Sequence, residues 1–226
     1  MTDDRPSIHE DQPLLTAGVP LKDAATAMIM IHGRGATARD ILSLTAEFEA
    51  PDLAYLAPQA AHNTWYPYSF LAPTAQNEPF LTSALDTLHR LLARLDDAGI
   101  APQQTVLLGF SQGACLATEY AARNPRPYGA IIGLSGGLIG APGTPRNYQG
   151  SLQGVPIFLG CSDVDPHIPA ERVQETDETF RKMGASVTTR LYPGMGHTIN
   201  EDEIEFIQQL LDAILGSRQE TQPGQG

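Results

Sequence analysis

Residues 105–124, TVLLGFSQGACLATEYAARN, predict a strand, a sharp turn and a helix in one short run. The apolar residues at 105–108 indicate the strand, and the pattern at 112–124 indicates the helix. Between them lies GFSQG at 109–113, which matches the G-x-S-x-G pattern of a nucleophile elbow. Such a turn strains its apex residue and pushes that side chain into the open, and it leaves no room for a Cβ two residues to either side. Ser111 is therefore the predicted nucleophile.

Strands and helices alternate along the chain on both sides of this run. The further predicted strands are 27–31, 53–56, 130–134, 155–159 and 186–192, with 13–19 as an antiparallel strand at one edge. The further predicted helices are 37–48, 80–97, 169–183 and one that starts at Asn200. Several strands are apolar on both faces, which is typical of parallel strands covered by helices. We therefore expect an α/β fold with a mostly parallel sheet and helices on both faces.

Composition and charge narrow the classes of protein. The chain has 226 residues and a formal net charge of −12, which disfavours nucleic acid and anionic membranes as partners. No apolar run approaches the ~20 residues needed to span a bilayer, and the acidic start MTDDRPSIHED does not match a signal peptide. We expect one cytoplasmic domain over 1–226, with flexible polar tails at about 1–11 and 217–226.

No spacing of side chains predicts a metal site or a cofactor. Cys115 and Cys161 are too few for a disulfide scaffold, and both lie in apolar segments. We expect them to be buried, reduced thiols.

A serine nucleophile needs a general base, normally a histidine held by a carboxylate. His197 lies in LYPGMGH at 191–197, between the last strand and the last helix, and it is the predicted base. The other histidines are expected elsewhere: His9 in the polar tail, His32 in structural hydrogen bonding, His62 in a loop, His89 on a helix surface, and His167 close to the acids without being the base.

The carboxylate is expected after the strand at 155–159, where Asp163 and Asp165 compete. Spacing alone does not decide between them. The order along the chain, Ser111 then the acid then His197, is that of α/β-hydrolases. Function in open parallel sheets gathers at the carboxyl ends of the strands, where all of these residues are expected to lie.

Four segments carry a resemblance to a known family: IHGRG at 31–35, GFSQGA at 109–114, SDVDPHIP at 162–169 and YPGMGH at 192–197. From about residue 27 to 215 the chain resembles the phospholipase/carboxylesterase branch of the α/β-hydrolases, which includes acyl-protein thioesterases. The resemblance implies Ser111 as nucleophile, His197 as base and Asp165 as the acid, with Asp163 in a supporting place.

The same resemblance implies an oxyanion hole made of the backbone N–H groups of Arg34 and Gln112. The side chain of Arg34 then needs no role. Arg34 and His167 stand where the family usually has apolar residues, which predicts a more polar entrance.

An aromatic loop offers candidate substrate-binding residues. The family's Trp-aromatic-Asp segment is TWYPYSF at 64–70 here, without the aspartate. Aromatic residues near a nucleophile predict an acyl or alcohol pocket, and the alternative is that they anchor a long loop to the core. The candidates are Trp65, Tyr66, Tyr68 and Phe70.

The prediction is a serine carboxylesterase that hydrolyses short- to medium-chain esters through an acyl-enzyme on Ser111. An acyl thioesterase or lysophospholipase would use the same triad. Residues 33–38, GRGATA, also satisfy the G-x-G-x-x-G/A pattern of a nucleotide-binding oxidoreductase, but the nearest acid, Asp52, precedes the next strand instead of following it. A binding module that kept the fold without activity is a further alternative. The expected partner is a small ester, and a homodimer stays open.

Overall fold

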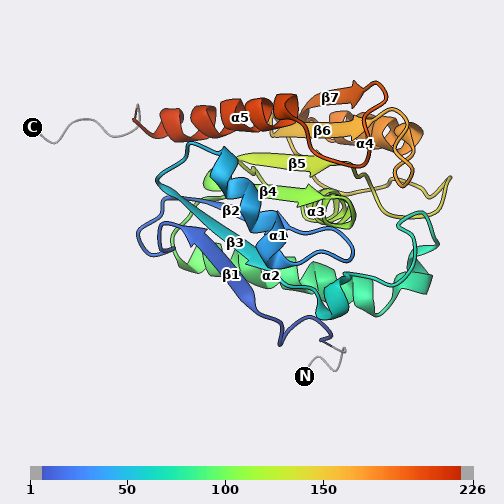
Figure 1. Ribbon diagram of the computed structural model, residues 1–226, viewed down its shortest axis with the longest axis horizontal. Coiled ribbons are helices and arrows are strands. Elements are labelled where there is room, and N and C mark those ends of the chain that lie inside the picture. The colour runs from blue at the N-terminus through green and yellow to red at the C-terminus, as the bar shows by residue number, and fades with distance from the viewer. Residues whose placement is uncertain (1–6, 220–226) are drawn as a thin grey trace, which may run out of the picture.

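Seven strands form one sheet in the computed structural model, which describes residues 7–219 (Figure 1). Across the sheet they are β1 (Leu14–Gly18), β3 (Leu53–Pro58), β2 (Thr26–Ile31), β4 (Thr105–Phe110), β5 (Ala130–Leu134), β6 (Pro156–Ser162) and β7 (Ser186–Tyr192). β1 pairs antiparallel with β3 at one edge, as expected, and all other neighbours are parallel. The predicted α/β fold with a mostly parallel sheet is confirmed.

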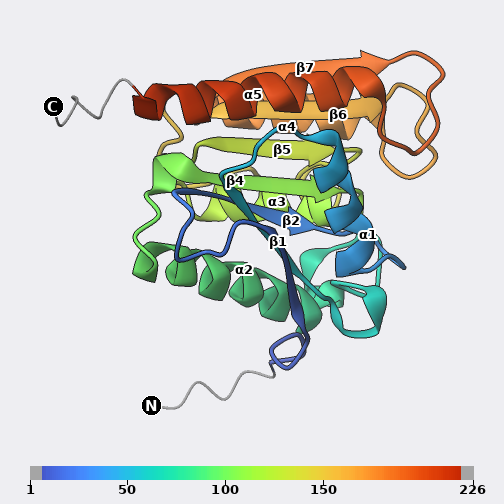
Figure 2. The ribbon, with the colours of Figure 1, turned by 60° about the vertical axis from the view of Figure 1, so that its left-hand side comes forward.

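Helices cover both faces of this sheet (Figure 2). α2 (Phe80–Asp97), α3 (Gln112–Arg123) and α4 (Ala170–Lys182) pack on one face, and α1 (Ala38–Leu42) and α5 (Glu201–Gln219) pack on the other. Along β2, Ala27, Ile29 and Ile31 belong to the first core, whereas Met28 and Met30 belong to the second. The period of two along a strand therefore supplies apolar side chains to both faces.

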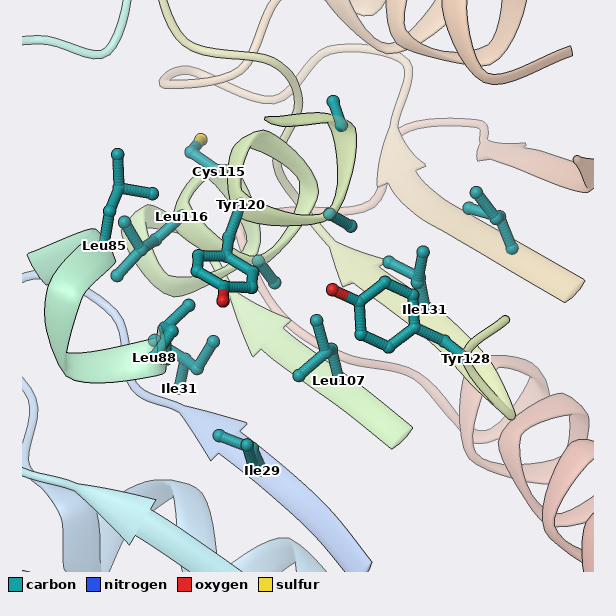
Figure 3. Packing of buried hydrophobic residues seen from close by; sticks show 14 of the residues in the cluster. Ile29, Ile31, Leu85, Leu88, Leu107, Cys115, Leu116, Tyr120, Tyr128 and Ile131 are labelled. Carbon is teal, nitrogen blue, oxygen red and sulfur yellow. The ribbon is translucent and has the colours of Figure 1, made fainter. Parts of the chain in front are cut away.

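The larger core lies between the sheet, α2 and α3 (Figure 3). Leu88 of α2, Leu116 of α3 and Leu107 of β4 all lie in it without exposed surface. Burying one such leucine contributes about 1.5–3 kcal/mol. This packing holds β4 and α3 at a fixed angle, and the turn between them carries Ser111.

Two local expectations are wrong. The helix expected at 37–48 is shorter, because α1 ends at Leu42 and a 3₁₀ turn, Ser43–Glu47, follows it. The tail expected at 1–11 is anchored at His9, the one buried residue among 7–11: its backbone N–H donates to Ser83 Oγ at 3.1 Å, and its Nε2 lies 3.0 Å from the Trp65 carbonyl.

The other tail is also shorter than expected, because α5 continues through Gln219. Residues 1–6 and 220–226, which include the rest of both predicted tails, lie outside the described residues.

Candidate active site

The turn from β4 to α3 places Ser111 at its apex. Ser111 has φ 56° and ψ −119°, a left-handed conformation that is strained for a residue with a side chain. A Cβ on Gly109 would lie 2.2 Å from the Gly113 carbonyl oxygen, and a Cβ on Gly113 would lie 2.0 Å from the Ile31 carbonyl oxygen. Only glycine fits either position, so the crowding expected from the sequence is confirmed.

Three distant segments meet in one chain of hydrogen bonds. His197 Nε2 lies 2.8 Å from Ser111 Oγ, and His197 Nδ1 lies 2.7 Å from Asp165 Oδ2. A carboxylate can only accept, so Nδ1 carries the proton and donates it. Nε2 of the neutral ring is then left to accept from the serine hydroxyl. The residues follow β4, β6 and β7, whose carboxyl ends lie at the same edge of the sheet.

Asp165 is held as a carboxylate although its side chain has no exposed surface. Its Oδ1 accepts from the backbone N–H groups of His167 at 2.8 Å and Ile168 at 3.0 Å. Burial acts to raise the pKa of Asp165, but the hydrogen bonds from His197 and the two amides outweigh it and lower the pKa below its usual value.

Geometry also separates the two competing acids. Asp163 Oδ1 accepts from the Gly194 N–H at 2.8 Å, and its own N–H donates to the Tyr192 carbonyl at 3.1 Å. Asp163 therefore fixes the loop that carries His197 through hydrogen bonds, whereas Asp165 contacts the imidazole itself.

Two backbone donors are available near Ser111. Within the described residues, neither the Arg34 N–H nor the Gln112 N–H has a hydrogen-bond acceptor. Gln112 opens α3, so its N–H also lies at the positive end of a helix dipole. A Cβ on Gly33 would lie 3.3 Å from Ser111 Cβ, which shows how closely the loop before Arg34 approaches the serine.

A cavity of about 440 Å³ opens at Ser111, within the size range of small-molecule sites. Three of the predicted substrate-binding residues, Tyr66, Tyr68 and Phe70, line it. The other lining residues are Arg34, Pro67, Ser69, Ser111, Gln112, Cys115, His167, Ile168 and His197.

The prediction that Trp65 binds substrate is contradicted by its position. Trp65 has no exposed surface and does not line the cavity. Its Nε1–H donates to the His32 carbonyl at 2.9 Å, and its ring lies against the rings of His9 and His32, with centroids 5.4 and 5.1 Å away. Trp65 anchors the loop to the core, which was the alternative considered from the sequence.

The remaining histidines and cysteines lie largely as expected. His32 Nδ1 lies 2.8 Å from the Gly33 carbonyl, its Nε2 accepts from the Ala60 N–H at 3.1 Å, and burial lowers its pKa. Both cysteines are buried, and burial raises the pKa of each thiol to about 12. Cys115, four residues after Ser111 on α3, was not predicted to line the cavity. That i, i+4 spacing on a helix was the signal that could have found it.

His167 is close to the reacting groups without joining their hydrogen bonds. Its ring centroid lies 4.9 Å from that of His197, and it lines the cavity. Arg34, the other residue expected to make the entrance more polar, also lines the cavity, and both residues are exposed.

The sheet and the serine at its elbow define the class of the protein, which is an α/β-hydrolase. The chain belongs to the phospholipase/carboxylesterase family, whose sequence model matches residues 19–215.

Solved structures and curated proteins support this placement. The structure of a phospholipase/carboxylesterase from Dyadobacter fermentans is 44% identical in sequence to this chain and has a TM-score of 0.86. The match covers 89% of this chain and 96% of that protein's chain. Esterase PE8 is 27% identical over 90% of this chain and 98% of its own, with a TM-score of 0.75. Acyl-protein thioesterase 1 of Gibberella zeae is 30% identical over 130 residues, 54% of this chain. That match spans only 53% of the thioesterase.

Membrane-spanning helices and metal-binding clusters are both absent from residues 7–219. None of the helices there is long and apolar enough to cross a membrane. The same residues contain no group of three or more His, Cys, Asp or Glu side chains that could hold a metal ion.

Proposed function

We propose that this chain is a serine carboxylesterase that hydrolyses short- to medium-chain carboxylic esters through an acyl-enzyme on Ser111. The observation that carries the proposal is the continuous hydrogen bonding from Asp165 through His197 to Ser111, at the opening of a cavity of about 440 Å³. The names of the family and of the related esterases support the reaction class.

In the first step, Ser111 Oγ attacks the ester carbonyl while His197 Nε2 takes its proton. Asp165 accepts from Nδ1–H and so keeps Nε2 aimed at the serine and stabilises the imidazolium that forms. The carbonyl oxygen becomes an oxyanion, and the N–H groups of Arg34 and Gln112 donate to it. Collapse of the tetrahedral intermediate expels the alcohol, which receives the proton from Nε2.

In the second step, water attacks the acyl-enzyme by the same route. His197 deprotonates the water, and the two amides again stabilise the oxyanion. Release of the carboxylic acid returns the proton to Ser111 Oγ. Every group in both steps belongs to this chain, and the reaction needs water as its only co-substrate.

An acyl thioesterase is the second candidate, because related proteins in two fungi are named acyl-protein thioesterase 1. A lysophospholipase would use the same parts. Ester and thioester hydrolysis share the nucleophile, the base and the oxyanion donors, so these groups do not separate the substrates. The small ester remains the first choice because the cavity is of the size that small molecules occupy.

The glycine loop at 33–38 fits this mechanism better than a nucleotide site. A Cβ at Gly33 would contact Ser111 Cβ at 3.3 Å, and the N–H of the next residue, Arg34, has no hydrogen-bond acceptor within the described residues. The proposed oxyanion hole accounts for the glycines of this loop, which supports the hydrolase over the dinucleotide alternative.

The test is the Ser111→Ala variant, assayed against p-nitrophenyl esters and acyl thioesters of graded chain length. We expect kcat/KM to fall by about 10³-fold or more, and covalent labelling by a fluorophosphonate to be lost. Near-wild-type ester hydrolysis by Ser111→Ala would refute the proposal. The better substrate of the two series in the wild-type protein decides between ester and thioester.

A further inference from the structure

Residues 64–70 form a segment without helix or strand, and residues 66–70 of this segment line the cavity. Irregular backbone beside a cavity must still find partners for its polar groups. Here every carbonyl from Tyr66 to Phe70 accepts a hydrogen bond from outside the segment. The segment, which we call the aromatic wall, is therefore fixed by its main chain.

Arg34 supplies three of these bonds. Its Nη1 donates to the Pro67 carbonyl at 2.9 Å, and its Nη2 donates to the carbonyls of Tyr66 at 2.9 Å and Tyr68 at 2.7 Å. The planar guanidinium presents several donors in fixed directions, so one side chain can hold three successive residues. The Arg34 side chain, which needs no role in the expected oxyanion hole, thus makes three hydrogen bonds of its own.

The side chain of Gln112 binds the same segment. Its Nε2 donates to the Tyr66 carbonyl at 2.8 Å, and its Oε1 accepts from the Trp65 N–H at 2.8 Å. Gln112 and Arg34 are also the residues whose backbone N–H groups are the proposed oxyanion donors. The wall and the oxyanion hole are thus positioned by the same two residues.

Buried Asn77 and Gly140 complete the anchoring at the far end. Asn77 Oδ1 accepts from the Tyr68 N–H at 2.9 Å, and Asn77 Nδ2 donates to the Ser69 carbonyl at 3.1 Å. The Gly140 N–H donates to the Phe70 carbonyl at 2.7 Å. Within the described residues, the carbonyls of Pro67 and Tyr68 are then the ones whose only hydrogen-bond donor is Arg34.

We infer that the Arg34 side chain is a positioning residue that sets substrate selectivity by clamping the aromatic wall. This inference rests on the proposed ester hydrolysis. The wall can favour one length of acyl or alcohol group only if its path is fixed before the substrate arrives, because a mobile wall adapts to each substrate and must be ordered on binding. Losing the clamp should therefore affect long substrates, which reach the wall, more than short ones.

The experiment compares Arg34→Met with Arg34→Lys, and uses Arg39→Met as a matched control for loss of an exposed positive charge. For each protein, kcat and KM are measured on p-nitrophenyl acetate, butyrate and octanoate, and on acetate esters of alcohols of graded length. Hydrogen–deuterium exchange is followed over residues 64–70 in the same preparations, and melting temperature reports folding.

In Arg34→Met we expect the octanoate-to-acetate ratio of kcat/KM, or the matching ratio in the alcohol series, to change by about tenfold, as loss of charge-assisted hydrogen bonds typically produces. Exchange over 64–70 should rise. Arg34→Lys should lie between Arg34→Met and the wild type, since an ammonium cannot reach all three carbonyls. Arg39→Met should match the wild type in both measurements.

Unchanged exchange in Arg34→Met would show that the wall does not depend on the clamp and would overturn the inference. Two outcomes would overturn the selectivity role even if exchange rises: a loss of kcat/KM that is equal at all chain lengths, or no loss of kcat/KM at all. If Arg34→Met fails to fold, Arg34→Lys is subject to the same two criteria. A wild-type protein inactive on every ester would refute the proposed function instead, and the exchange measurement would still report whether the clamp exists.

Discussion

Replacing Glu203 by glutamine should stabilise the protein at neutral and alkaline pH. Glu203 lies in the first turn of α5, without exposed surface, and its Oε2 accepts from the Asn200 N–H at 2.9 Å. Its Oε1 has no hydrogen-bond partner within the described residues, and it lies where a Cβ on Gly160 would be. Burial raises the pKa of Glu203 to about 7, with the neighbouring Asp202 charge adding to the rise and the Asn200 N–H opposing it.

The magnitude follows from linkage. In the unfolded chain the carboxyl loses its proton near pH 4.5, whereas the folded protein holds the proton up to about pH 7. The folded state therefore binds more protons in this window, so stability falls as pH rises from about 4.5 to 7 and stays low above it. At about 1.4 kcal/mol per pH unit, the difference between the two pKa values amounts to about 3 kcal/mol. Glutamine keeps an acceptor for the Asn200 N–H and has no charge to bury.

The assay is urea unfolding of the wild type and Glu203→Gln from pH 4 to 8, with the free energy of unfolding taken by linear extrapolation. We expect the advantage of the variant to grow by about 3 kcal/mol over that range. Glu205→Gln, two residues along the same helix and exposed, should stay within about 0.5 kcal/mol of the wild type at every pH. An advantage of Glu203→Gln that does not change with pH would refute the reasoning.

Two further substitutions test the elbow and the acid. Asp165→Asn should lower kcat by about 10²–10⁴-fold, because the amide carries no charge and, with its oxygen on the two backbone N–H groups, places an NH₂ donor opposite His197 Nδ1. Asp163→Asn should lower kcat less, and equal losses in steady-state assays would contradict the assignment of the acid. Gly113→Ala should destabilise the fold by about 3 kcal/mol or more, since its Cβ would lie 2.0 Å from the Ile31 carbonyl oxygen. The melting temperature of Gly113→Ala should fall by roughly 6–12 °C. The control is Gly216→Ala, whose Cβ would meet nothing within 4 Å and whose melting temperature should not fall. A Gly113→Ala protein that melts at the same temperature as the wild type would contradict the crowding argument.

The sheet was predictable because buried parallel strands are marked by local apolar composition. The ends of the strands were less predictable. The strand expected at 155–159 runs from Pro156 to Ser162, because its pairing with β7 extends beyond its apolar residues. The helix expected at 37–48 shows the reverse limit, since α1 gives way to a 3₁₀ turn after Leu42 that its apolar pattern does not reveal.

The candidate site divides in the same way. Ser111 and His197 were predictable from motifs that constrain the backbone, and their hydrogen bond is present in the structure. Trp65 was misplaced because an aromatic residue near a nucleophile fits a core and a pocket equally well. His9 is buried by partners more than fifty residues away in the sequence, and the polar segment around it contains no local pattern that predicts such contacts. The Arg34 clamp was missed because its acceptors are carbonyls, and every residue type carries one.

That choice of acceptors has a consequence for how substrate preference can change. Since the aromatic wall is held by hydrogen bonds to its main-chain oxygens, its backbone conformation does not depend on which side chains it bears. Tyr68, which is 58% exposed, can be exchanged for a smaller or charged residue while Arg34 still holds its carbonyl. The backbone of the segment thus stays fixed while its exposed side chains can vary. Substitution at position 68 therefore offers a route to new ester preferences that leaves the Ser111–His197–Asp165 geometry in place.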